Sequence, residues 1–345
     1  MLLLVTRWIF HVDMDEFIAA VEVLRHPVLR VKPVIVGGDG DPTKRGVVST
    51  ASYEAREFGV RSAMPLRTAL KRCPEGVFLA VDAEHYLEAS DRVMDALRTF
   101  PAIVQVLGWD EAFMAVETDD PEALARDVQR AVLERTELWC SIGVGDSKHR
   151  AKLASAFAKR RGLSRLTATE WHDVMGSRPV DSLWGIGSKT AAKLGELGIR
   201  TVDELASADD DVLAGRFGPN TGPWIRRLAT GEDDGEITAE PYVRRGQSHE
   251  RTFQYDLTDH DEIRREAERI ARELAAHLPD ARAVTRVTVK MRTSSFYTST
   301  HGVKLDEPTV DAESIVEAAL AALARFALDR PVRLLGVRAE LADPA

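Results

Sequence analysis

Three acidic residues lie where apolar runs begin or end, and carboxylates in such places suit a divalent cation. Asp13 follows the run at 7–12, and Asp110-Glu111 precedes the run at 112–116, with Asp110 97 positions after Asp13. If the two runs are neighbouring strands, the carboxylates converge on a hard oxygen site that suits Mg²⁺. Two such ions can activate a hydroxyl and stabilise a leaving group at phosphorus. Acidic residues are also common at turns and strand ends, so an ordinary structural role stays open on this evidence alone.

The segments that carry these residues alternate between strand and helix patterns. Apolar runs predict strands at 7–12, 34–36, 47–48, 103–106, 112–116 and 140–145. Helical spacing of apolar residues predicts helices at 52–60, 68–72, 83–100, 120–135 and 149–158. Ser52 is the expected cap and Gly59 the expected stop of the first of these. The alternation predicts a layer with its helices on one face of the sheet, in the split βαβ order of a ferredoxin-like fold.

The rest of the chain changes character twice. Residues 167–235 are helical and turn-rich, and residues 236–243 have the composition of a linker. The last hundred residues alternate again, with a helix at 259–278, strands near 284–293 and 296–304, a helix at 311–327 and a strand at 332–340. Three or four structural units are therefore expected.

Composition limits the function classes. The net charge of −9 argues weakly against a nucleic-acid partner, although the distribution of charge matters more than its sum. The only two cysteines, Cys73 and Cys140, have no paired spacing, so the sequence suggests neither a disulfide framework nor a zinc site and favours the reducing cytoplasm. The apolar N-terminal run is too short to span a membrane, is interrupted by Arg7, and is expected to be a buried strand rather than a signal peptide.

Five motifs occur in a fixed order along the chain: HVDMDEF (11–17), AAVE (19–22), SYEAREFGVRSAMP (52–65), GWDEAF (108–113) and CSIGVGDSKHRAKLAS (140–155). Together they resemble the Y-family DNA polymerases, most closely the DinB or DNA polymerase IV branch, over nearly the whole chain. The resemblance implies an α+β multidomain right-hand polymerase with a ferredoxin-like palm, small fingers, a helix-hairpin-helix thumb and an α/β little finger. It places the palm at 1–16 and 80–166, the fingers at 17–79, the thumb at 167–235, the linker at 236–243 and the little finger at 244–341.

The resemblance also assigns the site. It implies that Asp13, Asp110 and Glu111 are catalytic and bind two Mg²⁺ ions, with the carbonyl of Met14 as a further ligand and Mn²⁺ as the alternative ion. Asp15 belongs to the motif but is expected to be structural. The implied nucleotide-binding residues are Glu16, Phe17, Ile18, Thr50, Tyr53, Arg56 and Lys159.

Individual roles follow from the same resemblance. The residue matching Tyr53 hydrogen-bonds the triphosphate and packs against the sugar, and those matching Thr50, Arg56 and Lys159 contact phosphate, which suits a guanidinium fork and an ammonium point charge. Lys159-Arg160-Arg161 could equally be a solvated basic turn. The family's lysine usually precedes a proline, and Arg160 departs from that pattern.

Ile18 is the most informative departure. Family members generally carry two aromatic residues here, and the second excludes a 2′-hydroxyl by stacking beneath the sugar. This chain has Phe17 followed by Ile18. One hypothesis is weakened sugar discrimination, so that ribonucleotides are inserted as well as deoxyribonucleotides. The alternative is a tolerated core substitution, with Tyr53 maintaining selectivity.

Two features are expected to hold DNA. The segment 183–190 with the following helix reads as a helix-hairpin-helix, in which Gly185, Gly187 and Lys189 would contact phosphate. Arg286, Lys290 and Arg292 alternate with apolar residues, so a strand would place them on one sheet face as a basic stripe. A charged solvent face is the alternative. Arg244 and Arg245 are expected to extend this stripe, while the acidic helices near it cover the opposite face.

The sequence thus predicts a translesion-type DNA polymerase of low processivity, without proofreading. Its expected partners are primer–template DNA, dNTPs and also rNTPs, with no membrane contact, as a monomer. The C-terminal segment GVRAELADPA contains no clamp-binding peptide, which makes contact with a sliding clamp doubtful. Two alternatives are a gap-filling polymerase that uses ribonucleotides and a non-catalytic paralogue that occupies primer ends. The three carboxylates disfavour the paralogue, since clustered negative charge would weaken DNA binding.

Overall fold

A five-stranded sheet is the base of the first part of the chain in the computed structural model, which describes residues 6–233, 235–279 and 282–344. Its strands lie in the order β5 (Ile103–Val106), β6 (Glu111–Glu117), β1 (Arg7–Met14), β7 (Cys140–Gly145) and β8 (Leu163–Leu166). The first four are antiparallel to their neighbours, and β8 is parallel to β7. The helices α4 (Ala83–Leu97) and α5 (Pro121–Thr136) complete the ferredoxin-like order, as expected from the sequence.

The two faces of this sheet are used differently. Phe10, Val12 and Met14 of β1 belong to the core that α4 and α5 share with the sheet, whereas His11 and Asp13 point the other way because side chains alternate along a strand. The helix α6 (Lys148–Phe157) covers part of that second face. A Cβ atom added at Gly143 would lie 2.0 Å from the Ala151 carbonyl oxygen, so α6 packs directly against the backbone of β7. The prediction that helices cover one face only is therefore wrong for α6.

A small three-stranded sheet follows β1 along the chain. It consists of β3 (Thr50–Ala51), β2 (Val34–Val36) and β4 (Val77–Leu79), with the helices α1 (Phe17–Arg25), η1 (Pro27–Leu29) and α2 (Tyr53–Glu57). A further helix, α3 (Leu66–Arg72), lies between β3 and β4 in the sequence. Ser52 caps α2 by accepting a hydrogen bond from the Ala55 amide, as predicted. The strand predicted at 47–48 is wrong: Val47 forms only an isolated bridge to Pro65, and the strand lies at Thr50–Ala51.

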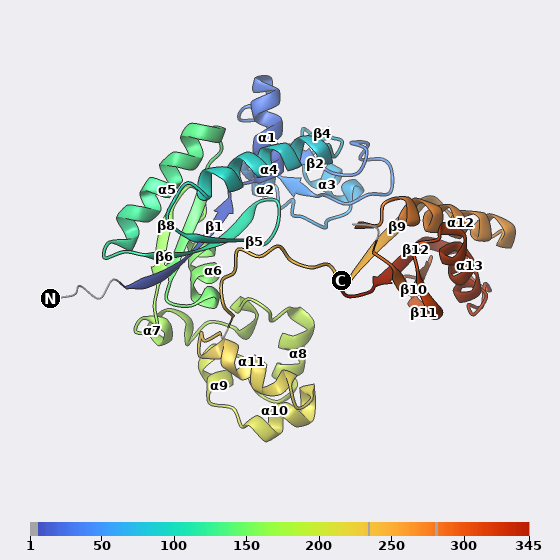
Figure 1. Cartoon of the computed structure of the whole chain (residues 1–345). Coiled ribbons are helices and arrows are strands. Elements are labelled where there is room, and N and C mark those ends of the chain that lie inside the picture. The colour runs from blue at the N-terminus through green and yellow to red at the C-terminus, as the bar shows by residue number, and fades with distance from the viewer. Residues whose placement is uncertain (1–5, 234, 280–281, 345) are drawn as a thin grey trace. The chain divides into compact units, whose positions relative to one another are not determined.

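Short helices make up the region after β8, as the sequence predicted, and α8 to α11 gather in one group (Figure 1). The elements are α7 (Trp171–Met175), η2 (Val180–Ser182), α8 (Ser188–Glu196), α9 (Val202–Ala206), α10 (Asp210–Phe217) and α11 (Thr221–Ala229). Trp171, Leu194 and Leu213 are fully buried in their core. Ile237, just beyond, packs against Phe113 of the five-stranded sheet.

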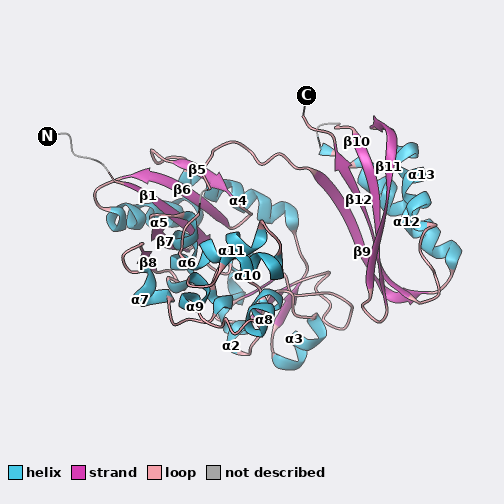
Figure 2. Ribbon diagram, turned by 90° about the horizontal axis from the view of Figure 1, so that it is seen from below, coloured by secondary structure: helices cyan, strands magenta, loops and turns pink. Residues whose placement is uncertain are grey.

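The last part of the chain forms a four-stranded antiparallel sheet with α12 (His260–Ala276) and α13 (Ala312–Leu323) on one side (Figure 2). The strand order is β11 (Thr298–Thr309), β10 (Val284–Thr293), β12 (Val332–Leu341), β9 (Gly246–Leu257). Both helices share an apolar core with the sheet, which confirms the expected covering. The chain divides into two compact units, Met1–Val36 with Ser49–Ser62 and Glu75–Pro241, and Gly37–Val48 with Ala63–Pro74 and Tyr242–Ala345. In the described part of the chain no helix has the length and apolar character to cross a membrane.

Candidate active site

Strand pairing brings the three acidic residues to one end of the five-stranded sheet. Asp13 of β1 is paired with Glu111 of β6, and the Met14 amide donates to the carbonyl of Asp110 at 2.8 Å. One side-chain ligand atom each from His11, Asp13 and Glu111 lies within 4.8 Å of the others. Residues distant in the sequence thus form a compact acidic group of the kind that holds a metal ion.

The carboxylates of this group repel one another, and nearby cationic side chains partly compensate their negative charge. Burial, and then the neighbouring charges of Asp13 and Glu111, raise the pKa of Asp110. Hydrogen bonding to His11, and after it to Lys152, lowers the pKa of Glu111 to about 2. The Lys159 ammonium lies 2.5 Å from an Asp13 oxygen. Crowded carboxylates that need nearby cations are a suitable environment for metal ions.

His11 is a site residue that the sequence reasoning missed. Its ring is fully buried, with Nδ1 2.7 Å from Ser155 Oγ and Nε2 3.1 Å from Lys152 Nζ. Burial lowers the pKa of His11. The signal was present, because His11 shares a strand face with Asp13.

The nucleotide-binding residues expected at the start of α2 lie beside this group. The Tyr53 hydroxyl donates to Asp15 Oδ1 at 2.6 Å, and its backbone amide donates to the Glu16 carboxylate. The Arg56 guanidinium lies 5.1 Å from the centre of the Tyr53 ring, and that of Arg160 lies 4.6 Å from it. Arg160, which stands where the family has proline, is therefore a second missed residue. Thr50, in β3, is half-buried and paired with Val36.

The aromatic and aliphatic residues at the start of α1 have different surroundings. Phe17 is only 3% exposed and lies in the sheet core, so its ring is turned away from the surface. Ile18 is half-buried and packs at the edge of that core. Of this pair, Ile18 is the residue with a partly open side chain.

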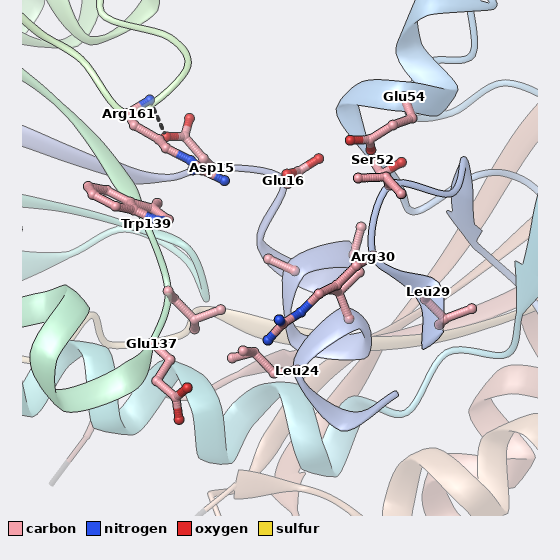
Figure 3. A pocket seen from close by; sticks show the side chains of 15 residues that line it. Asp15, Glu16, Leu24, Leu29, Arg30, Ser52, Glu54, Glu137, Trp139 and Arg161 are labelled. Carbon is pink, nitrogen blue, oxygen red and sulfur yellow. Dashed lines mark hydrogen bonds between the residues drawn. The ribbon is translucent and has the colours of Figure 1, made fainter. Parts of the chain in front are cut away.

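A cavity of about 390 Å³ adjoins Asp15 and Glu16. Its wall includes the apolar side of α1, Ser52, Trp139 and Arg161 (Figure 3). The Arg161 amide donates to Asp15 Oδ2 at 2.7 Å, the bond dashed in Figure 3. Asp15 therefore lines this cavity and also accepts the hydrogen bond from the Tyr53 hydroxyl.

The residues expected to bind DNA through the hairpin are all exposed. Gly185 has a φ of +100°, and Gly187 is the N-cap of α8, with Lys189 in its first turn. A Cβ atom at Gly187 would meet nothing within 4 Å among the described residues, so packing does not require glycine there. The preceding Trp184 stacks on His149 of α6 at 6.1 Å, which fixes the hairpin against the sheet's helix.

The basic stripe of β10 exists but is less positive than predicted. Its three basic side chains alternate with buried residues, as expected. Arg286 lies 3.6 Å from Glu340 of β12, and Lys290 lies 2.9 Å from Glu250 of β9, so two other strands of the sheet add acidic groups to the same face. Arg292 Nε donates to Thr298 at 2.8 Å. Arg244 and Arg245 are exposed at the start of this unit.

Comparison with known proteins identifies the family. The model of the impB/mucB/samB family matches residues 12–156. The model of that family's C-terminal domain matches residues 244–344, and the model of its helix-hairpin-helix motif matches residues 169–199. DNA polymerase IV 2 of Mycobacterium tuberculosis strain H37Rv is 49% identical over 341 residues, covering 97% of this chain and 98% of the relative. The chain belongs to the impB/mucB/samB family of DinB-type, Y-family DNA polymerases. It is a translesion-type, DNA-directed DNA polymerase.

Other relatives agree with this assignment. DNA polymerase IV of Methanoculleus marisnigri is 39% identical over 98% of this chain and 95% of its own length. A solved Y-family chimera, Dbh-Dpo4(243-245)-Dbh, superposes with a TM-score of 0.86 at 25% identity, over 96% of this chain and 98% of the chimera. Polymerases of this family are metal-dependent, which fits the acidic group at the end of β1.

Proposed function

We propose that this polymerase uses Asp13, Asp110 and Glu111, with the Met14 carbonyl, to hold two Mg²⁺ ions, with Mn²⁺ as the alternative. The crowded carboxylates carry the proposal, because three hard oxygen donors at one strand end match such ions. When bound, these ions activate the primer 3′-hydroxyl and neutralise charge on the triphosphate.

The chain's own residues orient the substrates. Lys159 and Arg56 are proposed to contact the triphosphate, where an ammonium and a guanidinium supply donors to phosphate oxygens. Lys159 is already beside the acidic group, at 2.5 Å from Asp13. Thr50 is proposed as a third contact. Glu16 is assigned an indirect role, because its carboxylate holds the backbone of Tyr53.

The domain boundaries also enter as a proposal. The proposed palm, residues 1–16 and 80–166, contains the five-stranded sheet. The proposed thumb, residues 167–235, contains the short helices, and the proposed little finger, residues 244–341, contains the four-stranded sheet. The fingers at 17–79 are shared between the two compact units, since residues 37–48 and 63–74 group with the last part of the chain. The exposed hairpin at Gly185 and the β10 stripe are the proposed DNA-binding surfaces.

Weak sugar discrimination is the specific part of this proposal. Ile18 has no ring to fill the space beside the sugar, and Phe17 is buried, so neither side chain supplies a flat steric barrier. A hydrophobic shape difference of this size changes selectivity by about 10- to 200-fold.

Primer extension with single dNTPs and rNTPs tests the proposal. Wild type and Ile18→Leu should insert ribonucleotides, whereas Ile18→Phe should reject them while keeping dNTP insertion. Ile18→Leu is the matched control, because it keeps an aliphatic side chain of the same size. Equal rejection of rNTPs by wild type and Ile18→Phe would remove the role of Ile18.

A further inference from the structure

A buried histidine lies behind the Glu111 carboxylate. His11 is fully buried on the face of β1 that α6 covers, and its ring lies 5.0 Å from that of Phe113, edge to face. A buried polar group needs hydrogen-bond partners, and both ring nitrogens have one. Nδ1 lies 2.7 Å from Ser155 Oγ, whereas Nε2 lies 3.1 Å from Lys152 Nζ and 3.3 Å from Glu111 Oε2. His11 therefore connects α6 to the acidic group.

The Glu111 carboxylate is held through one of its two oxygens. The Lys152 ammonium forms an ion pair with Oε2, and Nε2 of His11 faces the same oxygen. In the described part of the chain no hydrogen bond ends on the other oxygen, Oε1. One oxygen of Glu111 is thus bound from the side of α6, and the other is available to an ion at the acidic group.

This arrangement holds whichever ring nitrogen of His11 carries the proton. With the proton on Nε2, His11 donates to Glu111, and Nδ1 accepts from the Ser155 hydroxyl. With the proton on Nδ1, His11 donates to Ser155 Oγ, and Nε2 accepts from Lys152, which in turn binds Glu111. The Ser155 hydroxyl serves both forms, because its proton can also go to the Lys152 carbonyl oxygen at 2.7 Å. In either form His11 binds one member of the ion pair.

The direction of the Lys152 side chain depends on the same contacts. Its side chain is 18% exposed, and its ammonium lies 5.5 Å from the centre of the Trp184 ring as well as beside His11 and Glu111. A lysine has a flexible four-carbon stem, so several contacts are needed to keep its ammonium in one place. His11 supplies the fully buried one. Without it, Lys152 can turn toward solvent, and Glu111 loses the contact that fixes its rotation.

We propose that His11 is a positioning residue for metal binding, which keeps Lys152 on one oxygen of Glu111 so that the other oxygen is presented to the ion. This inference rests on the proposed function, in which Glu111 is a metal ligand. Nε2 is already engaged by the ion pair and Mg²⁺ prefers oxygen, so His11 acts on the ion only through Glu111. Removing a group that holds a metal ligand from behind typically changes metal affinity 10- to 100-fold.

The test measures Mn²⁺ binding to the full-length chain without DNA or nucleotide, from the electron paramagnetic resonance signal of free Mn²⁺. The proteins compared are wild type, Asp110→Ala, His11→Phe, His11→Gln, Lys152→Met and Lys148→Met. The binding that Asp110→Ala removes is assigned to the acidic group. His11→Phe keeps a ring and deletes both nitrogens. His11→Gln places an amide, which can donate and accept, near the position of Nε2.

The expected result is weaker binding when either side chain behind Glu111 is lost. Mn²⁺ affinity should fall about 10- to 100-fold in His11→Phe and in Lys152→Met, and His11→Gln should recover most of it. Lys148→Met is the matched control, because it removes the same charge from the same helix one turn earlier. The Lys148 ammonium lies near the Phe113 ring and the Glu236 carbonyl, so this variant should bind Mn²⁺ like wild type.

Two results would overturn the inference. One is wild-type affinity in a folded His11→Phe. The other is unchanged or tighter binding by Lys152→Met, since tighter binding would mean that the ammonium competes with the ion for Glu111. Urea unfolding shows whether His11→Phe is folded, and if it is not, Lys152→Met decides alone. Equal Mn²⁺ binding by wild type and Asp110→Ala would instead refute the proposed metal site.

Discussion

The five-stranded and the four-stranded sheets each pack two helices on one face, yet their candidate functional residues differ in exposure. In the first, Asp15 and His11 are 3% and 0% exposed, and each is fixed by several contacts. In the second, the side chains of Arg286 and Lys290 are 41% and 31% exposed, each near one acidic partner. The contacts around the first sheet therefore hold its buried side chains in fixed positions, whereas the exposed basic side chains of the second sheet can change their partners.

The energetic consequence differs accordingly. Exposed ion pairs contribute about 0–1 kcal/mol, so the pairs on the four-stranded sheet can be exchanged for phosphate contacts at little cost. Buried contacts around the acidic group depend on each other, and losing one leaves its partners unsatisfied. Substitutions should therefore have large effects at the first sheet and small ones at the second.

The largest effect should come from Asp110→Ala. Loss of one of three proposed metal ligands should reduce primer extension by about three orders of magnitude. DNA binding, measured by fluorescence anisotropy, should persist. Asp91→Ala, an exposed acid on α4, is the control and should extend primers normally. Normal primer extension by Asp110→Ala would show that the acidic group tolerates substitution as well as the four-stranded sheet does.

Gly143→Ala tests how tightly the first sheet is packed. The new methyl group would lie 2.0 Å from the Ala151 carbonyl oxygen and 2.2 Å from the Ser155 amide, so α6 must move. We expect a loss of about 3 kcal/mol in the free energy of unfolding, measured with urea. Gly195→Ala, inside α8 with open space around it, should instead gain about 0.5–1 kcal/mol.

Acid should weaken the packing between α6 and the hairpin through His149. This ring is buried, and neither nitrogen has a hydrogen-bond partner in the described part of the chain. Burial lowers the pKa of His149 to about 4; the charge of Asp233 opposes this shift, and that of Arg150 adds to it. The unfolded chain takes up a proton near pH 6.5 that the folded chain takes up only near pH 4, so stability falls as the pH is lowered through that window.

The full contribution is at most about 3 kcal/mol. Urea unfolding at pH 7 and pH 5 should show a smaller pH dependence for His149→Leu than for wild type. An unchanged pH dependence in His149→Leu would mean that the ring is accessible to water and that this region is looser than the contacts indicate.

The smallest effects should come from the four-stranded sheet. Lys290→Ala should weaken DNA binding a few-fold and reduce the slope of log affinity against log salt by about 0.9, the value for one phosphate contact. Glu250→Gln should strengthen binding slightly, because it releases Lys290 from its partner at 2.9 Å. If neither substitution changes the salt slope, Lys290 does not face DNA.

Sequence patterns predicted those features that depend on local periodicity. The alternation in β10 placed Arg286 and Lys290 on one face, and the strand ends placed Asp13 near Glu111, as the structure shows. Features that depend on packing between distant segments were missed. Nothing local indicates that glycine at 143 allows α6 onto the second face, or that Trp184 stacks on His149.

In the candidate active site, too, the sequence indicated single residues but not the contacts between them. The family resemblance pointed to Asp15 as structural and to Tyr53 as a nucleotide contact, but the bond between their side chains is visible only in three dimensions. The acidic partners of the basic stripe were also unpredictable, because Glu250 and Glu340 lie on strands far from β10 in the sequence.

The direct packing of α6 on Gly143 has an evolutionary consequence. Lys152 near one end of the contact and Lys159 just beyond the helix reach Glu111 and Asp13, so a shift of this backbone would displace both lysines from both carboxylates at once. Substitutions outside this contact can therefore accumulate without moving the backbone that holds the two ion pairs. Ile18 lies at the edge of the core, where a side chain can vary without moving the helix that sets these distances.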